Sequence, residues 1–479
     1  MAEESHRSCS NGLRETRHKD LAVASPAAPR RGKGTIARLA GLGERYTGTM
    51  LHRHRSPLPE WAIPAAYALA ALVAAVALPR LENRYLPTFV SPVSASVALS
   101  LYSSITSGML ALTGIVFSLA FVMVQFSAVA YSPRLVLWIS RDPVMWNSIG
   151  VFTATFLYSI GAMLWVDRGG SGKVPFLSGL VAVLLLLGSV AMFLALIQRI
   201  GLLQINRMLS FTGNLGRKVV EQMYPSIEQP EQEVSPAELA GLPITQTVLY
   251  TGEPLALQAI DEQLLAGLSM RSGGSVEVAS AVGDTLIAGT PLLRVFGGET
   301  LLDDTTWRSA FETGEDRTFE QDPKYALRLL VDIAIKALSP AINDPTTAVQ
   351  ALDQIQDLLF RLGSRRLEIG TVRDSGGNIR LVIPHPSWED FLRLAFDEIR
   401  ACGATSVQVM RRMRALVSDL IAALPNERHA ALEHHRERLN VTTARSFADD
   451  EDKLEASVED KQGLGMPRKS ERAHSVAEK

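Results

Sequence analysis

Residues 176–197 read FLSGLVAVLLLLGSVAMFLALI, a run without a charged side chain. A helix needs roughly 20 mostly apolar residues to cross a bilayer, because lipid cannot hydrogen-bond to its backbone. This segment meets that requirement and predicts an integral membrane protein.

Three earlier segments have a similar character and cover residues 61–78, 97–129 and 146–166. Together with 176–197 they predict a four-helix transmembrane domain over residues 59–200. No Asp, Glu, Lys or Arg lies deep in any of these segments. That composition weakens a coupled-transport or proton-relay function, which often uses an intramembrane charge.

Basic residues flank the first and last segments and predict that both termini are cytoplasmic, because lysine and arginine are enriched on that side. Residues 1–58 are expected to form a disordered basic tail. The turn Ser132-Pro133-Arg134 follows the second segment and is interpreted as a membrane-edge anchor with its arginine among lipid phosphates. The flanking basic residues are Arg30, Arg31, Lys33, Arg38, Arg45, Arg53 and Arg55, then Arg199, Arg207, Arg217 and Lys218.

Small and polar residues share one helical face of the second segment, because they recur at steps of four and three. Such a face can be a close seam between membrane helices, or it can line a polar pathway. The seam is the simpler interpretation, and both remain open. The residues of this face are Ser100, Ser104, Ser107, Ala111, Gly114, Ser118 and Gln125.

The remaining chain divides by composition into a connector over 201–243, a small β-rich module over 244–298, a helical or α+β cytoplasmic domain over 299–440 and a disordered tail over 441–479. A short helical pattern is expected around residues 255–268 of the module. Gly283 to Leu292 is similar to the turn-strand-turn of lipoyl-like barrel-sandwich folds. No lysine occupies a hairpin tip where a lipoyl or biotinyl group would attach, so no cofactor is expected.

A helical hairpin is predicted by two Asp-Pro pairs, since Pro is favoured at the first position of a helix. The helices are expected over 323–338 and 345–362, joined by a short corner. Polar residues there could form a pocket for a cation or small anion. The simpler interpretation is structural, with capping by Asp344 and Ser339 and an ion pair between Asp332 and Lys336. The candidate residues are Asp332, Ser339, Asn343, Asp344 and Thr347.

The stretch 332–353, DIAIKALSPAINDPTTAVQALD, resembles the signature of a bacterial membrane-protein family known as domain of unknown function 2254. The four apolar segments, the Ser132-Pro133-Arg134 turn and the glycine-rich β segment follow in the same order. The resemblance implies a location in the bacterial inner membrane. It brings no activity and no catalytic residues.

A β-hairpin is predicted over residues 366–385 with its turn at 375–378, followed by helices at 388–401 and 406–424. His385 is interpreted as a loop residue and not as a metal ligand, because no paired His, Cys or Asp spacing accompanies it. His434 and His435 lack zinc-protease spacing. Arg411, Arg412 and Arg414 are expected on a solvated or lipid-facing helix side.

Two function classes follow. The first is a non-enzymatic anchor whose cytoplasmic domain senses or scaffolds, and the alternative is an oligomeric channel or facilitator for ions or small solutes. A net charge of −2 without a basic aromatic-rich run argues against nucleic-acid binding. No nucleophile elbow, metal-ligand set or nucleotide loop is found, so an enzyme is not expected. The expected partners are the lipid bilayer and further copies of the chain, because four helices make a small transporter; a small ligand or ion stays unidentified.

Overall fold

The computed structural model describes residues 59, 61–85, 93–130, 143–167, 174–200, 205–227 and 241–464, with the side chains of 123, 124, 126–130, 199 and 200 set aside. The expected N-terminal tail and the Ser132-Pro133-Arg134 turn lie outside these residues, as do 201–204, 228–240 and 465–479.

Each apolar segment forms a helix: α2 Ala62–Tyr85, α3 Ala95–Ala130, α5 Pro143–Met163 and α6 Phe176–Ile200. Of the described helices, three are long and apolar enough to cross a membrane, namely α2, α3 over Ala95–Val122 and α6 over Phe176–Gln198. The third expected span corresponds to α5, which is not among these three.

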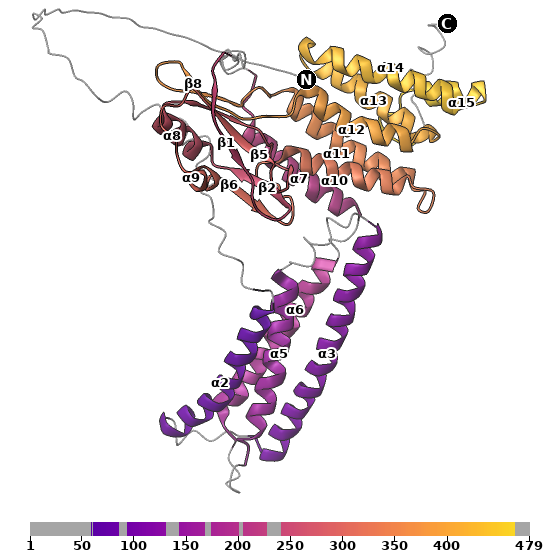
Figure 1. Ribbon diagram of the computed structural model, residues 1–479. Helices are drawn as coiled ribbons and strands as arrows, with labels where there is room; N and C mark the ends of the chain where they lie inside the picture. The colour runs from indigo at the N-terminus through magenta and orange to yellow at the C-terminus, as the bar shows by residue number, and fades with distance from the viewer. Residues whose placement is uncertain are drawn as a thin grey trace, which may run out of the picture. The chain divides into compact units, whose positions relative to one another are not determined.

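Helix α5 packs against α2, α3 and α6 (Figure 1). Its buried residues include the hydroxyl side chains of Ser148, Thr155 and Ser159. The Thr155 and Ser189 hydroxyls are 2.9 Å apart and join α5 to α6. Close packing on α2 requires glycine at Gly161, where an added Cβ would lie 2.5 Å from the Cβ of Ala75.

The connector contains α7 Ile205–Met223, an amphipathic helix that belongs to the soluble core. Its buried residues Met208, Leu209, Val219 and Val220 join the main hydrophobic cluster, and α7 packs on the helical hairpin. The connector expected over 201–243 thus contains a helix whose apolar face is buried by the domain that follows.

Two sheets form the β region. The first has the order β1 Ile244–Leu249, β5 Pro291–Phe296, β3 Ser275–Val278, β8 Ile379–Val382 and β7 Thr371–Arg373. The second has the order β4 Thr285–Leu286, β2 Leu255–Ile260 and β6 Phe311–Gly314. Helices α8 Glu262–Ser272 and α9 Asp304–Arg308 accompany them.

Two expectations for this region are corrected. Residues 255–260 form a strand between β4 and β6, and the helix begins only after the cap Asp261, whose side chain accepts from Leu264 N. The module does not end at residue 298, because β8 pairs in parallel with β3 and completes the first sheet. The hairpin of β7 and β8 itself is confirmed.

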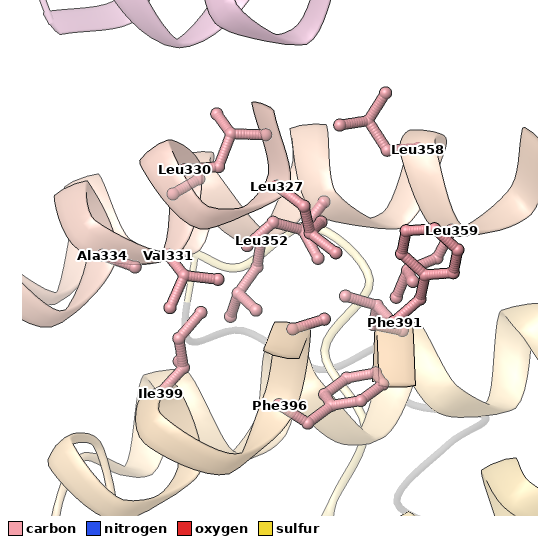
Figure 2. Packing of buried hydrophobic residues seen from close by; sticks show 14 of the residues in the cluster. Leu327, Leu330, Val331, Ala334, Leu352, Leu358, Leu359, Phe391, Phe396 and Ile399 are labelled. Carbon is pink, nitrogen blue, oxygen red and sulfur yellow. The ribbon is translucent and has the colours of Figure 1, made fainter. Parts of the chain in front are cut away.

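The helical domain contains α10 Pro323–Ala337, α11 Pro345–Gly363, α12 Trp388–Cys402, α13 Val407–Ala423, the 3-10 turn η3 Asn426–Arg428, α14 His429–Ser446 and α15 Asp450–Ser457. The predicted hairpin of α10 and α11 is confirmed, and the two helices pack together. Figure 2 shows side chains from α10, α11 and α12 meeting in one core, among them Leu327, Leu352, Phe391 and Phe396.

The structure differs from the disordered tail expected over 441–479. Helix α14 continues to Ser446, and α15 packs on α13 and α14. Ala456 and Val458 are buried, and Gln408 donates a 2.5 Å hydrogen bond to the carbonyl of Gly463. Few apolar residues hold this segment, which is why hydrophobic periodicity did not reveal it.

Candidate functional site

The hairpin corner brings Asp344 and Thr347 together as a helix cap. Asp344 Oδ1 accepts from the Thr347 backbone N–H at 3.1 Å, and Oδ2 accepts from the Thr347 hydroxyl at 2.6 Å. Ser339 Oγ donates to the Lys336 carbonyl at 2.7 Å, within the end of α10. Asn343 has a φ of 48°, a left-handed conformation that Asn adopts more readily than most residues. These contacts match the capping interpretation.

Asp332 belongs to a different set of contacts. Its Oδ1 accepts from Arg328 Nε at 2.7 Å, and Arg328 Nη2 also donates to Glu398 Oε2 on α12 at 2.9 Å. The hydrogen bond from Arg328 lowers the pKa of the Glu398 carboxyl. Arg328 therefore joins α10 to α12, and Asp332, one turn along the same helix, holds the Arg328 guanidinium.

The small and polar face of α3 is exposed along its length. Its residues Ser100, Ser104, Ser107, Ala111, Gly114, Ser118 and Gln125 are all exposed. The opposite face packs into the bundle through Ala98, Tyr102, Ile105, Met109 and Val116. A Cβ added at Gly108 or Gly114 would meet nothing within 4 Å. One copy of the chain thus leaves this face uncovered by described residues.

The Ser104 hydroxyl on this face donates to the Ser100 carbonyl at 2.8 Å. A serine that bonds to the preceding turn of its own helix has its donor satisfied even in lipid. The face can therefore contact lipid, a neighbouring helix or water. Its residue types fit a seam between helices and the lining of a polar pathway equally well.

The prediction that three arginines of α13 lie on a solvated or lipid-facing side is wrong. Arg411, Arg412 and Arg414 are only 4%, 5% and 8% exposed. Arg412 Nε lies 2.9 Å from Asp353 Oδ1 on α11. Arg414 donates to the Ala456 carbonyl at 3.1 Å and to the Thr443 hydroxyl at 2.9 Å, and Arg411 pairs with Glu455. These arginines bind α11, α14 and α15 to α13.

The sequence contains no local signal for this burial. Val409, Met410, Met413, Leu416 and Val417 share one face of α13, and the three arginines lie on the other face, which is the pattern of a helix with a solvated side. The arginines are buried because α11, α14 and α15 supply their partners, and two of these helices come later in the chain.

His385 lies in the loop between β8 and α12, as expected, and its side chain is half-buried. Burial, with a smaller contribution from Lys324, lowers the pKa of its imidazole to about 4. Its ring meets the ring of Tyr224 edge-on at a centroid distance of 6.4 Å. Across the ranges that the structure describes, no three His, Cys, Asp or Glu side chains gather in a group that could hold a metal ion.

Comparison with protein families identifies a family of predicted membrane proteins. The family described as "Predicted membrane protein (DUF2254)" matches residues 59–419. Uncharacterized proteins of Mycobacterium bovis and Mycobacterium tuberculosis are 27% identical to this chain over 359 residues, which covers 73% of this chain and 68% of each relative. An uncharacterized protein from another Mycobacterium tuberculosis strain is 26% identical over the same length. No solved structure matches.

Proposed function

The chain belongs to the predicted membrane protein family DUF2254, and from this premise we propose that it is a non-enzymatic scaffold that assembles through α3 and holds a folded domain at the membrane. The exposed small and polar face of α3 carries the proposal. A face that the bundle leaves uncovered, with glycines that let another backbone approach, is suited to a second copy of the same helix.

The proposal includes four crossings of a bacterial inner membrane. Helix α5 has 21 residues and so a length of about 31 Å, close to the hydrocarbon thickness. A helix surrounded by three others contacts protein more than lipid, so its serines and threonines are tolerated at depth. With four crossings, the basic residues before α2 and after α6 favour a cytoplasmic location for both termini.

The scaffold role draws support from the soluble part. Asp344 caps α11, Asp332 holds Arg328 on α10, and the three α13 arginines join α13 to other helices, so these polar atoms serve the packing of the domain. Such a domain is better suited to binding partners through its surface than to catalysing a reaction.

A channel or facilitator is the second candidate, and the hydroxyls on the same α3 face favour it. If copies of α3 surround an axis, Ser100, Ser104, Ser107 and Ser118 would line a polar pathway. The two candidates share an oligomer and differ in whether water enters it.

One experiment separates them: the mass of the detergent-extracted protein and the ion flux through proteoliposomes, for wild type and for Ser107→Leu with Gly114→Leu. Gly188→Leu on α6 is the control, since a Cβ at Gly188 meets nothing within 4 Å and lies on another helix. We expect the wild type and the control to have the mass of an oligomer and the double variant to have a smaller mass. None of the three should conduct ions. Flux that the double variant alone abolishes would favour the channel. A monomeric wild type would contradict both.

A further inference from the structure

A pocket of about 460 Å³ lies between α12 and α14 in the helical domain. Glu389 and Arg393 line it from α12, one helical turn apart, and Ala431, His434, His435 and Arg438 line it from α14. This volume falls within the range of small-molecule sites in proteins, roughly 300–1,000 Å³. None of these residues takes part in the proposed assembly through α3.

His435 is the buried polar group of this pocket. It is 4% exposed, and its Nδ1 has no hydrogen-bond partner among the described residues. Its ring packs on Phe396 with the centroids 5.1 Å apart, which fixes the plane of the imidazole. A buried polar atom without a partner is costly, so a ligand that bonds to it gains more than one that meets a solvated group.

The imidazole is neutral at physiological pH. The pKa of His435 is lowered to about 4, mainly by burial, with Asp397 raising it and His434, Arg438 and Arg400 lowering it by smaller amounts. A neutral imidazole carries one N–H donor, which Nδ1 can present. The ring can therefore donate to an acceptor in the pocket without a change of charge.

Two guanidinium groups add positive charge to the pocket walls. Arg438 Nη1 is 3.2 Å from Asp397 Oδ1, and this contact uses one of its five N–H donors. Arg393 pairs with Asp390 and is largely exposed, so it stands at the mouth. Glu389 is the one acidic side chain in the lining and is exposed, where solvent screens it.

We propose that this pocket binds a small molecule through an oxyanion, either a carboxylate or a phosphate. The oxyanion accepts from the His435 Nδ1–H at the base of the pocket and from the Arg438 guanidinium on its wall, while Arg393 attracts it at the mouth. Arginine suits this role because its planar fork matches the two oxygens of a carboxylate or phosphate.

The test uses the full chain in nanodiscs of neutral lipid, titrated with inorganic phosphate and, separately, with succinate, while thermal unfolding is followed. A second arm replaces the neutral lipid with phosphatidylglycerol and adds no solute, which distinguishes a lipid headgroup from a free ligand. The variants are Arg438→Gln, with a side chain two-fifths exposed, and His435→Gln. The control is Arg436→Gln, an exposed residue of α14 that pairs with Glu433 and does not line the pocket.

We expect one of these oxyanions to stabilise the wild type, and we expect Arg438→Gln to weaken this binding by about tenfold or more, because a charged hydrogen bond is lost. His435→Gln should weaken it as well, and Arg436→Gln should leave it unchanged. The proposal is overturned if none of the three probes raises the unfolding temperature of the wild type. It is also overturned if a folded Arg438→Gln variant responds like the wild type.

Discussion

Asp344 satisfies two donors of one residue, the backbone N–H and the hydroxyl of Thr347, at the first turn of α11. The same corner holds Asn343 at a φ of 48°. A tight corner of this kind fixes the angle between α10 and α11, whose facing leucines form part of the main core. Asp344 and Asn343 thus stabilise the domain by allowing α10 and α11 to pack together.

Replacing the cap should lower stability by a predictable amount. We expect Asp344→Ala to reduce the free energy of unfolding by about 1 kcal/mol, because the first turn of α11 loses its acceptor. Asp344→Asn should retain most of it, since an amide oxygen can also cap. Thermal unfolding of the full chain in detergent checks this. Equal losses in both variants would mean that the charge, and not the cap, matters.

Two histidines with a lowered pKa predict a loss of stability in mild acid. The pKa of His385 and that of His435 are both lowered to about 4, against about 6.5 in an unfolded chain. Above pH 6.5 both states are neutral and stability is complete. Between pH 6.5 and 4 the unfolded chain binds protons that the folded chain refuses, so stability falls as pH falls, by at most about 1.4 kcal/mol per pH unit and site.

Unfolding at pH 7 and at pH 5 measures this effect. His385→Gln and His435→Gln should each make the fall between these pH values smaller, while His434→Gln, at an exposed position with only a minor effect on the pKa of His435, should change it much less. A wild type with equal stability at both pH values would contradict the assignment of neutral buried rings.

Among the elements, α15 is the one whose removal should have the largest effect for its length. It supplies the Ala456 carbonyl to Arg414 and Glu455 to Arg411. Beyond it, Lys461 lies 2.6 Å from Asp419 on α13. This short helix therefore covers Arg411 and Arg414 of α13 and is part of the packed domain.

Truncation at two points isolates this role. A chain ending after Phe447 should unfold several °C lower than the full chain, because buried arginines lose partners and Ala456 and Val458 no longer cover the core. A chain ending after Leu464 keeps these contacts and should unfold as the full chain does. The idea fails if both truncated chains unfold at the same temperature.

The elements that could be predicted from sequence are those with local signals. Helices α10 and α11 each begin at a proline after Asp, and α12 and α13 begin after Ser387 and Ser406, whose side chains cap them. Strand β2 could not be told from a helix, since its residues LALQAI suit either state and its neighbours β4 and β6 decide. For the same reason α15 was missed, because its stability comes from contacts with α13.

In the molecule as a whole, α5 packs against the three other helices of its bundle, and its Ser148, Thr155 and Ser159 are buried. These neighbours could not be predicted, because hydropathy measures how well a helix tolerates lipid and not which helices it meets. The α3 face was found from its spacing, but its exposure could not be predicted, because periodicity does not say which face a bundle uses. The histidine pocket needed α12 and α14 to be placed side by side.

The close contact of α2 with α5 can be tested at Gly161. Gly161→Val should destabilise the bundle, because its Cβ would overlap the Cβ of Ala75, 2.5 Å away. Gly188→Val on α6 has nothing within 4 Å and should have little effect. Size-exclusion profiles and melting in detergent compare the two. Similar behaviour of both variants would show that α2 and α5 do not pack closely.

Strand β8 has a consequence for synthesis. Its parallel neighbour β3 ends at Val278, and α10 and α11 are made before β8 emerges from the ribosome. Until then, β3 presents one edge without its strand, and open edges pair readily with other chains. The hairpin of α10 and α11 has local contacts and folds quickly, whereas the sheet waits for a distant segment. A nascent chain halted between residues 300 and 375 is therefore the form most exposed to aggregation and to chaperones.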